Sequence, residues 1–263
     1  MAEHILFVFE GEKTEKTITD SLLKNFIESD KRIVISSFKT DIYALYKLMS
    51  KDEDLDVFAL MKERDPELKS FSRDVFSQLF LFFDYDGHSP AASDEKISEL
   101  LGFFNEETER GKLFISYPMV ESIKCISNLD AIEEFCRHKV NICDCSKFKN
   151  YVAENSHKSL IHFNLYEPSL WNDVVRMHCV KANFIIKGDM VFPTSYFNQI
   201  DIFVVQKSDF IDKDKTVSIL SSFPMLLLDF FGHQKLFVLV SGEQIEDGAV
   251  LNSEDGSHLN LPT

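Results

Sequence analysis

The chain has 263 residues, of which 44% are hydrophobic, and it contains 25 phenylalanines against 9 glycines and 7 prolines. This composition excludes a disordered or fibrous protein and suits one large domain, or one domain with a sizeable extension, that needs no metal in order to fold. The formal net charge of −15 excludes a protein that holds nucleic acid through a broad basic surface. A polyanionic substrate would have to be bound through local lysines, metal ions or a basic partner.

Nothing in the sequence indicates export or insertion into a membrane. The five cysteines are an odd number, and the N-terminal apolar run is too short for a secretory leader, so we expect reduced thiols in the cytoplasm. The longest later apolar run, 223–231, is interrupted by Pro224 and Asp229 and is too short to span a membrane. Cys143 and Cys145 are too closely spaced for a usual zinc site, and we expect both thiols to be buried.

The first strand is predicted over His4–Phe9, a continuous apolar run that ends at Glu10. A helix follows, with Thr14 as its cap and apolar residues at three- and four-residue spacing up to Phe26. The second strand is expected over Arg32–Phe38. Two buried strands joined by a helix are typical of a parallel strand–helix–strand unit.

The next helix is predicted to start at an Asp41 cap and to extend to Leu48. Residues 51–75 are highly charged, and we expect an irregular or helical excursion there. The third strand is predicted over Leu79–Phe83, the most hydrophobic short segment of the chain.

An amphipathic helix is predicted over Ser93–Arg110, ended by Gly111, and a fourth strand over Leu113–Tyr117. The alternation of strands and helices predicts an α/β fold with an open, mainly parallel sheet flanked by helices. In such sheets the functional crevice lies at the carboxyl ends of the strands.

The second half of the chain is predicted to be a helical extension packed on this core. Helices are expected over residues 128–138, 169–184, 195–207 and 216–231, although 201–205 would also suit a strand. The predicted boundaries are 1–125 for the catalytic core, 126–241 for the helical appendage and 242–263 for a polar C-terminal tail.

Three acids follow predicted strands and are the main candidates for a functional site. Glu10 follows the first strand, and Asp84 and Asp86 follow the third. The carboxyl ends of parallel strands lie at one edge of the sheet, so these carboxylates should gather there and repel one another unless a cation lies between them. Oxygen ligands suit Mg²⁺ or Mn²⁺. Gly11 and Lys13, in the loop after Glu10, would approach a phosphate.

The segments FVFEGEKTE (7–15) and LFFDYDGH (81–88) resemble the Toprim fold of topoisomerases, primases and overcoming-lysogenization nucleases, in which a Glu-Gly and an Asp-x-Asp bind catalytic metal. YPMVES (117–122) and FPMLLLDFFG (223–232) are similar to segments of Toprim proteins from bacterial phage-defence systems, namely the RloB-like and abortive-infection proteins. About thirty residues, spread over most of the chain, carry this resemblance.

The resemblance implies a metal-dependent endonuclease that acts on DNA or RNA, including tRNA, as the effector of an antiviral defence system. It also implies a partner ATPase that holds or activates the nuclease, and it leaves room for a homodimer. Glu10, Asp84 and Asp86 carry over as catalytic and metal-binding residues, with Mg²⁺ or Mn²⁺ as cofactor. The further residues that it suggests are Glu15, Glu121 and Lys124.

Two other functions stay open. The segment LFLFFDYDGH also resembles the first motif of haloacid-dehalogenase-type phosphatases, in which Asp84 would be the nucleophile, Asp86 the general acid–base and Ser116 the second motif. Against this, the motif is not on the first strand, His88 replaces the usual threonine, and no late acidic motif follows an apolar strand. The third function is that of a non-catalytic Toprim-like subunit that binds an ATPase.

Overall fold

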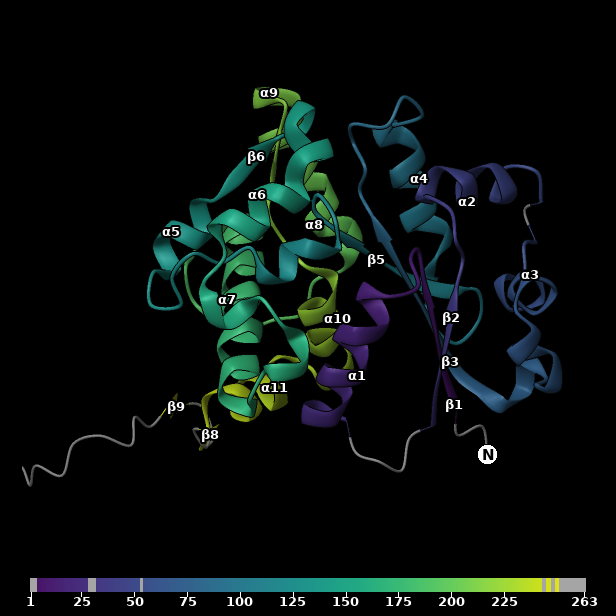
Figure 1. The fold of residues 1–263 in the computed structure, drawn as a ribbon, viewed down its shortest axis with the longest axis horizontal. Helices are drawn as coiled ribbons and strands as arrows, with labels where there is room; N and C mark the ends of the chain where they lie inside the picture. The colour runs from purple at the N-terminus through teal and green to yellow at the C-terminus, as the bar shows by residue number, and fades with distance from the viewer. Residues whose placement is uncertain (1–3, 28–31, 53, 243–244, 247–248, 251–263) are drawn as a thin grey trace, which may run out of the picture.

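The computed structural model describes residues 4–27, 32–52, 54–242, 245–246 and 249–250. Its centre is a five-stranded sheet in the order β2-β1-β3-β5-β4, in which only β4 is antiparallel to its neighbour (Figure 1). The strands are β1 (His4–Phe9), β2 (Arg32–Ser37), β3 (Phe76–Asp84), β4 (Asn105–Glu106) and β5 (Gly111–Ser116). The predicted α/β class with a mainly parallel sheet is therefore confirmed.

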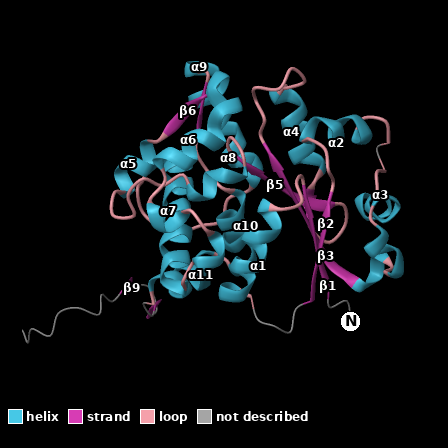
Figure 2. Cartoon of the chain, viewed as in Figure 1, coloured by secondary structure: helices cyan, strands magenta, loops and turns pink. Residues whose placement is uncertain are grey.

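Helices cover both faces of the sheet. Figure 2 shows α1 (Thr14–Phe26) and α10 (Ser222–Phe231) on one face, and α2 (Ile42–Met49), α3 (Val57–Arg64) and α4 (Asp94–Phe103) on the other. The central strands β1 and β3, which lie between these layers, are rich in phenylalanine and mostly buried. This burial explains why β1 and β3 are continuous apolar runs rather than alternating ones.

Aromatic stacking fixes α10 on the sheet. The ring of Phe223 lies 5.3 Å from that of Phe82 at an interplanar angle of 12°, and 5.9 Å from that of Phe9. Phe9 and Phe82 are register partners on β1 and β3. A helix from near the C-terminus thus completes the core of the N-terminal half, and a single hydrophobic cluster contains residues of both halves.

In the second half of the chain, the elements besides α10 are α5 (Ile132–Arg137), β6 (Lys139–Asn141), α6 (Phe148–Asn155), α7 (Pro168–Lys187), α8 (Gln199–Val205), α9 (Asp212–Asp214), β7 (Thr216–Ser218), α11 (His233–Ser241), β8 (Ile245–Glu246) and β9 (Ala249–Val250). Of these, α5, α8 and α11 pack, as α10 does, against α7, the longest described helix. Most of the predicted tail, 242–263, lies outside the described residues. No single helix of the described chain has both the length and the apolarity to cross a membrane.

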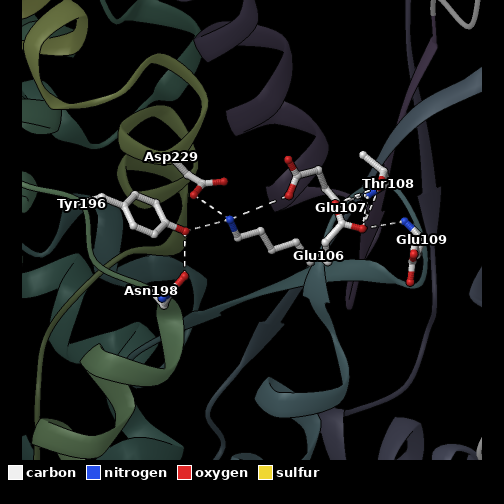
Figure 3. Close-up of polar contacts among 8 residues, drawn as sticks. Glu106, Glu107, Thr108, Glu109, Tyr196, Asn198 and Asp229 are labelled. Carbon is white, nitrogen blue, oxygen red and sulfur yellow. Dashed lines mark hydrogen bonds and ion pairs between the residues drawn. The ribbon is translucent and has the colours of Figure 1, made fainter.

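Polar contacts join α10 to β5 at both ends. At one end Ser116 Oγ lies 2.8 Å from Ser222 Oγ. At the other end the buried ammonium of Lys112 lies 2.7 Å from Asp229 Oδ1 and 3.0 Å from the hydroxyl of Tyr196, with the Glu107 carboxylate at 3.8 Å (Figure 3). These contacts hold the helix in one position along the strand.

Several predicted elements are wrong in their bounds. Thr14 is the first residue of α1 rather than its cap, because Lys13 occupies the N-cap position without a side-chain bond. The helix expected over 93–110 ends at Phe103, where the chain turns into β4. The helix expected over 216–231 is divided into β7 and α10. Cys145 is buried as predicted, but Cys143 is exposed.

Candidate functional site

The site lies at the carboxyl ends of β1 and β3, which are adjacent parallel strands. Glu10 follows the last residue of β1, and Asp84 is the last residue of β3. The backbone N–H of Asp84 donates a 3.1 Å hydrogen bond to Glu10 Oε2, while the backbone N–H of Glu10 donates to the carbonyl of Phe82. The two carboxyl-bearing residues predicted from separate segments are thus in direct contact.

Asp86 is held in a loop with a specific backbone conformation. Its φ is +48°, a left-handed value that aspartate tolerates better than most residues. The preceding residue, Tyr85, is buried and anchors the loop, because its hydroxyl donates to Asp94 Oδ1 at 2.7 Å and its carbonyl accepts from the Tyr43 hydroxyl at 3.0 Å. His88 Nδ1 lies 4.0 Å from Asp86 Oδ1.

Glu15 returns from the first turn of α1 to the loop that carries Glu10. The backbone N–H of Gly11 donates to Glu15 Oε1 at 3.0 Å, and Glu15 is 8% exposed. A Cβ atom on residue 11 would lie only 2.7 Å from that oxygen. A larger residue at position 11 would therefore displace the Glu15 carboxylate from its present place against the backbone.

Glu121 and Lys149 add a buried acid and a cation. Glu121 lies on the 3-10 helix Val120–Lys124 and is 7% exposed. Its Oε1 lies 3.4 Å from Lys149 Nζ, whereas its buried Oε2 has no hydrogen-bond partner within the described residues. Lys149, in the first turn of α6, is mostly exposed. An unpaired buried carboxylate oxygen is costly, and a ligand or ion at this position would satisfy it.

Burial and mutual repulsion disfavour ionisation of the clustered acids. Burial raises the pKa of Glu10 to about 8, with further increases from the charges of Asp86, Asp41 and Glu15. Burial also raises the pKa of Asp84 well above its usual range, followed by the charges of Glu10 and Asp86, and it raises the pKa of Asp86. Raised carboxyl pKa values of this kind are concentrated at functional sites. Part of each increase comes from repulsion between the carboxylates, and a bound cation would remove that repulsion.

Two adjoining hollows of about 520 and 440 Å³ open onto these acids, and Glu10, Asp84 and Lys149 line both. The first hollow is also lined by Gly11, Lys13, Thr14, Glu15, Ser37, Lys39 and Asp41, and the second by Asp86, His88, Ser146 and Asn150. The N-terminus of α1 thus faces the first hollow. Free N–H groups at such a terminus, together with nearby lysines, favour an anion such as a phosphate.

The donor chemistry of the site fits a hard divalent cation. Every candidate ligand is a carboxylate, and the raised pKa values and the unpaired Glu121 oxygen are features that a cation would relieve. Over the described ranges, no three His, Cys, Asp or Glu side chains are arranged as a ready ligand set for one ion. Mg²⁺ commonly takes only one or two carboxylates from the protein and the rest of its ligands from water and phosphate.

The structure brings together most of the residues predicted from the sequence, with one exception. Lys124 lines neither hollow, and its ammonium lies 5.2 Å from the ring centroid of Phe163 instead. Lys149, which lines both hollows and pairs with Glu121, was not predicted from the sequence. No motif surrounds Lys149, and only the packing of α6 against the 3-10 helix of Glu121 places it there.

Comparison with protein-family models found no match, and neither the curated proteins nor the solved structures contained a significant match.

Proposed function

We propose that this protein is a divalent-metal-dependent phosphodiesterase that cuts nucleic acid, with a Toprim-like site. The observation that carries the proposal is the contact between Glu10 and Asp84 at the ends of adjacent parallel strands, with Asp86 in the same hollow. Three acids of this kind, from two distant segments, are poorly explained by packing, because their burial and proximity oppose folding unless a cation is bound.

Glu10, Asp84 and Asp86 would hold Mg²⁺ or Mn²⁺, which when bound supplies an activated water and stabilises negative charge on a phosphodiester. The chain's own groups bind and orient the substrate. Lys149, which lines both hollows, would contact a non-bridging phosphate oxygen. Lys13 and the N-terminus of α1 accept an adjacent phosphate in the first hollow.

The buried acids Glu15 and Glu121 support the site rather than contact the scissile bond. Glu15 fixes the Gly11 loop through its 3.0 Å bond to the backbone, which positions Glu10. Glu121 holds Lys149 by the 3.4 Å ion pair, and its second oxygen has no hydrogen-bond partner among the described residues. Loss of the Glu15 carboxylate should therefore loosen the Gly11 loop, whereas loss of the Glu121 carboxylate should release Lys149.

The biological role that we propose is that of a cytoplasmic effector in antiviral defence, held or activated by an ATPase. The resemblance of EGEKTE, DYDGH and YPMVES to Toprim proteins of phage-defence systems supports it. The net charge of −15 also supports a dependence on a partner, because the isolated chain should bind a phosphate backbone weakly at physiological salt. Low activity of the isolated chain is therefore expected.

The test is cleavage of plasmid DNA, genomic DNA and tRNA by the purified protein in Mg²⁺ or Mn²⁺, alongside Asp84→Ala and Glu10→Ala. Low salt should be used first, because the acidic chain binds polyanions weakly. Metal-dependent cutting that both variants abolish supports the proposal. If the protein binds an ATPase but cuts no nucleic acid, whether or not the ATPase is present, the result would favour a non-catalytic subunit.

The phosphatase alternative has less support from the geometry. Ser116, which would have to face a phosphate as the second motif, is 2% exposed, and its hydroxyl is hydrogen bonded to Ser222. Glu10, which has no role in that mechanism, lies against Asp84. Hydrolysis of a small phosphomonoester that persists in Glu10→Ala would nevertheless point to Asp84 as a nucleophile.

A further inference from the structure

The outer edge of β2 is an unpaired strand edge. β2 is the terminal strand of the sheet, and its only strand partner is β1. No other described residue pairs with its outer edge, and the strand contains no proline and no bulge. Proteins usually protect long edges of this kind, since exposed N–H and C=O groups form a template for another strand. At the opposite side of the sheet, the terminal strand β4 has only two residues.

This edge forms the floor of a groove with a wall on each face of the sheet. The groove has a volume of about 660 Å³ and is floored by residues 33–37 of β2. One wall is the face of α1 that carries Lys16 and Asp20, and the other is the segment 64–71. The side chains of Ile33, Val34 and Ile35 are only half buried there. The groove has the form that an added strand requires: an open edge, apolar side chains and room for a backbone.

The charges along the groove are nearly balanced, in contrast to those of the chain as a whole. Three basic and four acidic residues line it: Lys16, Lys39 and Arg64, and Glu12, Asp20, Asp65 and Glu67. A chain with a net charge of −15 repels its own copies. Two copies can therefore associate only through a surface on which positive and negative side chains nearly balance, as they do in this groove. A polyanion would gain little electrostatic attraction from such a surface.

We infer that a second copy of this chain occupies the groove, through antiparallel pairing of the two β2 strands about a two-fold axis near Ile35. Ile35 is the middle residue of the five that floor the groove. Pairing of this kind joins the two sheets into one continuous sheet and covers both unpaired edges. The interface is isologous, so each residue has to be compatible with its own symmetry mate.

The charges of α1 fit this symmetry. Thr14 and Ser37 both line the hollow at the carboxyl edge of the sheet, and the rise is about 1.5 Å per residue along a helix and 3.3 Å along a strand. The midpoint between Lys16 and Asp20 lies four helical residues, about 6 Å, from the level of Thr14. Ile35 lies two strand residues, about 6.6 Å, from Ser37, so the two points are at roughly the same height above that edge. The two-fold axis therefore sets Lys16 opposite the partner's Asp20, and Asp20 opposite the partner's Lys16.

Sedimentation velocity over a concentration series tests the inference, with Lys16→Asp and Asp20→Lys as variants. Within one chain the two side chains form an ion pair with each other across a turn of α1, at 3.2 Å, and both are more than half exposed, at 58% and 57%. Each variant therefore loses only a weak surface pair of its own chain and should still fold. The wild-type chain should show a monomer–dimer equilibrium. Each single variant should weaken the dimer at least about tenfold, because like charges then face each other across the axis.

The decisive measurement mixes the two single variants. One variant has two acids at these positions and the other has two lysines, so their heterodimer should form more tightly than either homodimer, and the double variant Lys16→Asp/Asp20→Lys should recover dimerisation. A chain that stays monomeric at every concentration overturns the inference. So does a dimer that none of these changes affects, because it must use another surface. Neither result depends on the proposed nuclease activity.

Discussion

The backbone N–H of Asp84 donates a 3.1 Å hydrogen bond to Glu10 Oε2, and this bond ties together the ends of two adjacent strands. A neutral glutamine at position 10 can still accept it. Glu10→Gln should therefore preserve the fold while removing a charge that holds the cation. We expect metal-dependent cleavage to fall by at least about 100-fold, since even the loss of groups that support metal ligands costs 10–100-fold.

Titration calorimetry with Mn²⁺ measures the accompanying loss of metal affinity. Glu154→Gln is the matched control, because Glu154 is an exposed glutamate that lines neither hollow. Equal metal binding by wild type and Glu10→Gln would exclude Glu10 as a ligand.

The metal-free protein should become less stable as the pH rises from about 4.5 to about 8. Burial raises the pKa of Glu10 from 4.5 to about 8 in the folded state. Below pH 4.5 the carboxyl is protonated in both states, and between the two values the unfolded chain loses the proton that the folded chain retains. The contribution of Glu10 to stability is therefore lost across this window.

Thermal unfolding at a series of pH values, with and without Mg²⁺, measures this dependence. Mg²⁺ should raise the melting temperature more at pH 8 than at pH 5.5, because it binds the ionised carboxylates. Glu10→Gln should have a flatter profile than wild type. A wild-type profile that coincides with that of Glu10→Gln would contradict the assigned shift.

Lys149 should be more important for activity than Lys124. Lys149 is close to Glu121 in space, whereas Lys124 is close to it only in the sequence. Lys149 lines both hollows and pairs with Glu121 at 3.4 Å, whereas Lys124 lies over the ring of Phe163. Lys149→Ala should reduce kcat/KM by about tenfold or more, in line with the loss of one charged hydrogen bond. Lys124→Ala should stay within about twofold of wild type.

Lys149→Ala should also lower the stability, because it leaves the buried carboxylate of Glu121 without its cation, whereas Lys124→Ala should change the stability little. Urea unfolding measures both variants. An unchanged stability in Lys149→Ala would mean that solvent already screens the charge of Glu121.

Lys112 should be important for stability rather than for catalysis. Its buried ammonium is 2.7 Å from Asp229, so Lys112→Met leaves an uncompensated carboxylate. We expect a loss of about 3 kcal/mol in the free energy of unfolding. The double variant Lys112→Met/Asp229→Leu should recover much of it. Urea denaturation measures the free energy of unfolding of both variants. Equal losses in the single and double variants would argue against an ion pair between Lys112 and Asp229.

The sequence was informative where one physical signal dominated. The apolar runs of β1 and β3 and the Asp41 cap, whose Oδ1 accepts from Ala44 N at 2.8 Å, were all predicted. The convergence of Glu10 with Asp84 followed from the parallel sheet alone. These features depend on local burial patterns and on a general rule of topology, so that neighbouring residues are sufficient to identify them.

The features that were missed depend on long-range packing. Lys149 reaches the acids only because α6 packs beside the 3-10 helix of Glu121. The helix predicted over 216–231 is interrupted because Thr216–Ser218 pairs with the distant β6. Amphipathic periodicity cannot reveal a strand partner some eighty residues away. Lys124 was selected by proximity in sequence, which fails when a side chain packs on an aromatic ring instead.

The stacking of Phe223 on Phe82 has a consequence for how the protein is made. Part of one face of the N-terminal sheet, beside α1, stays uncovered until residues 222–231 have left the ribosome. A nascent chain that stops short of them has apolar strands exposed to water, and such surfaces invite aggregation. The acid cluster should therefore assemble only after residues 222–231 have been translated, so that a product truncated before them has no competent site.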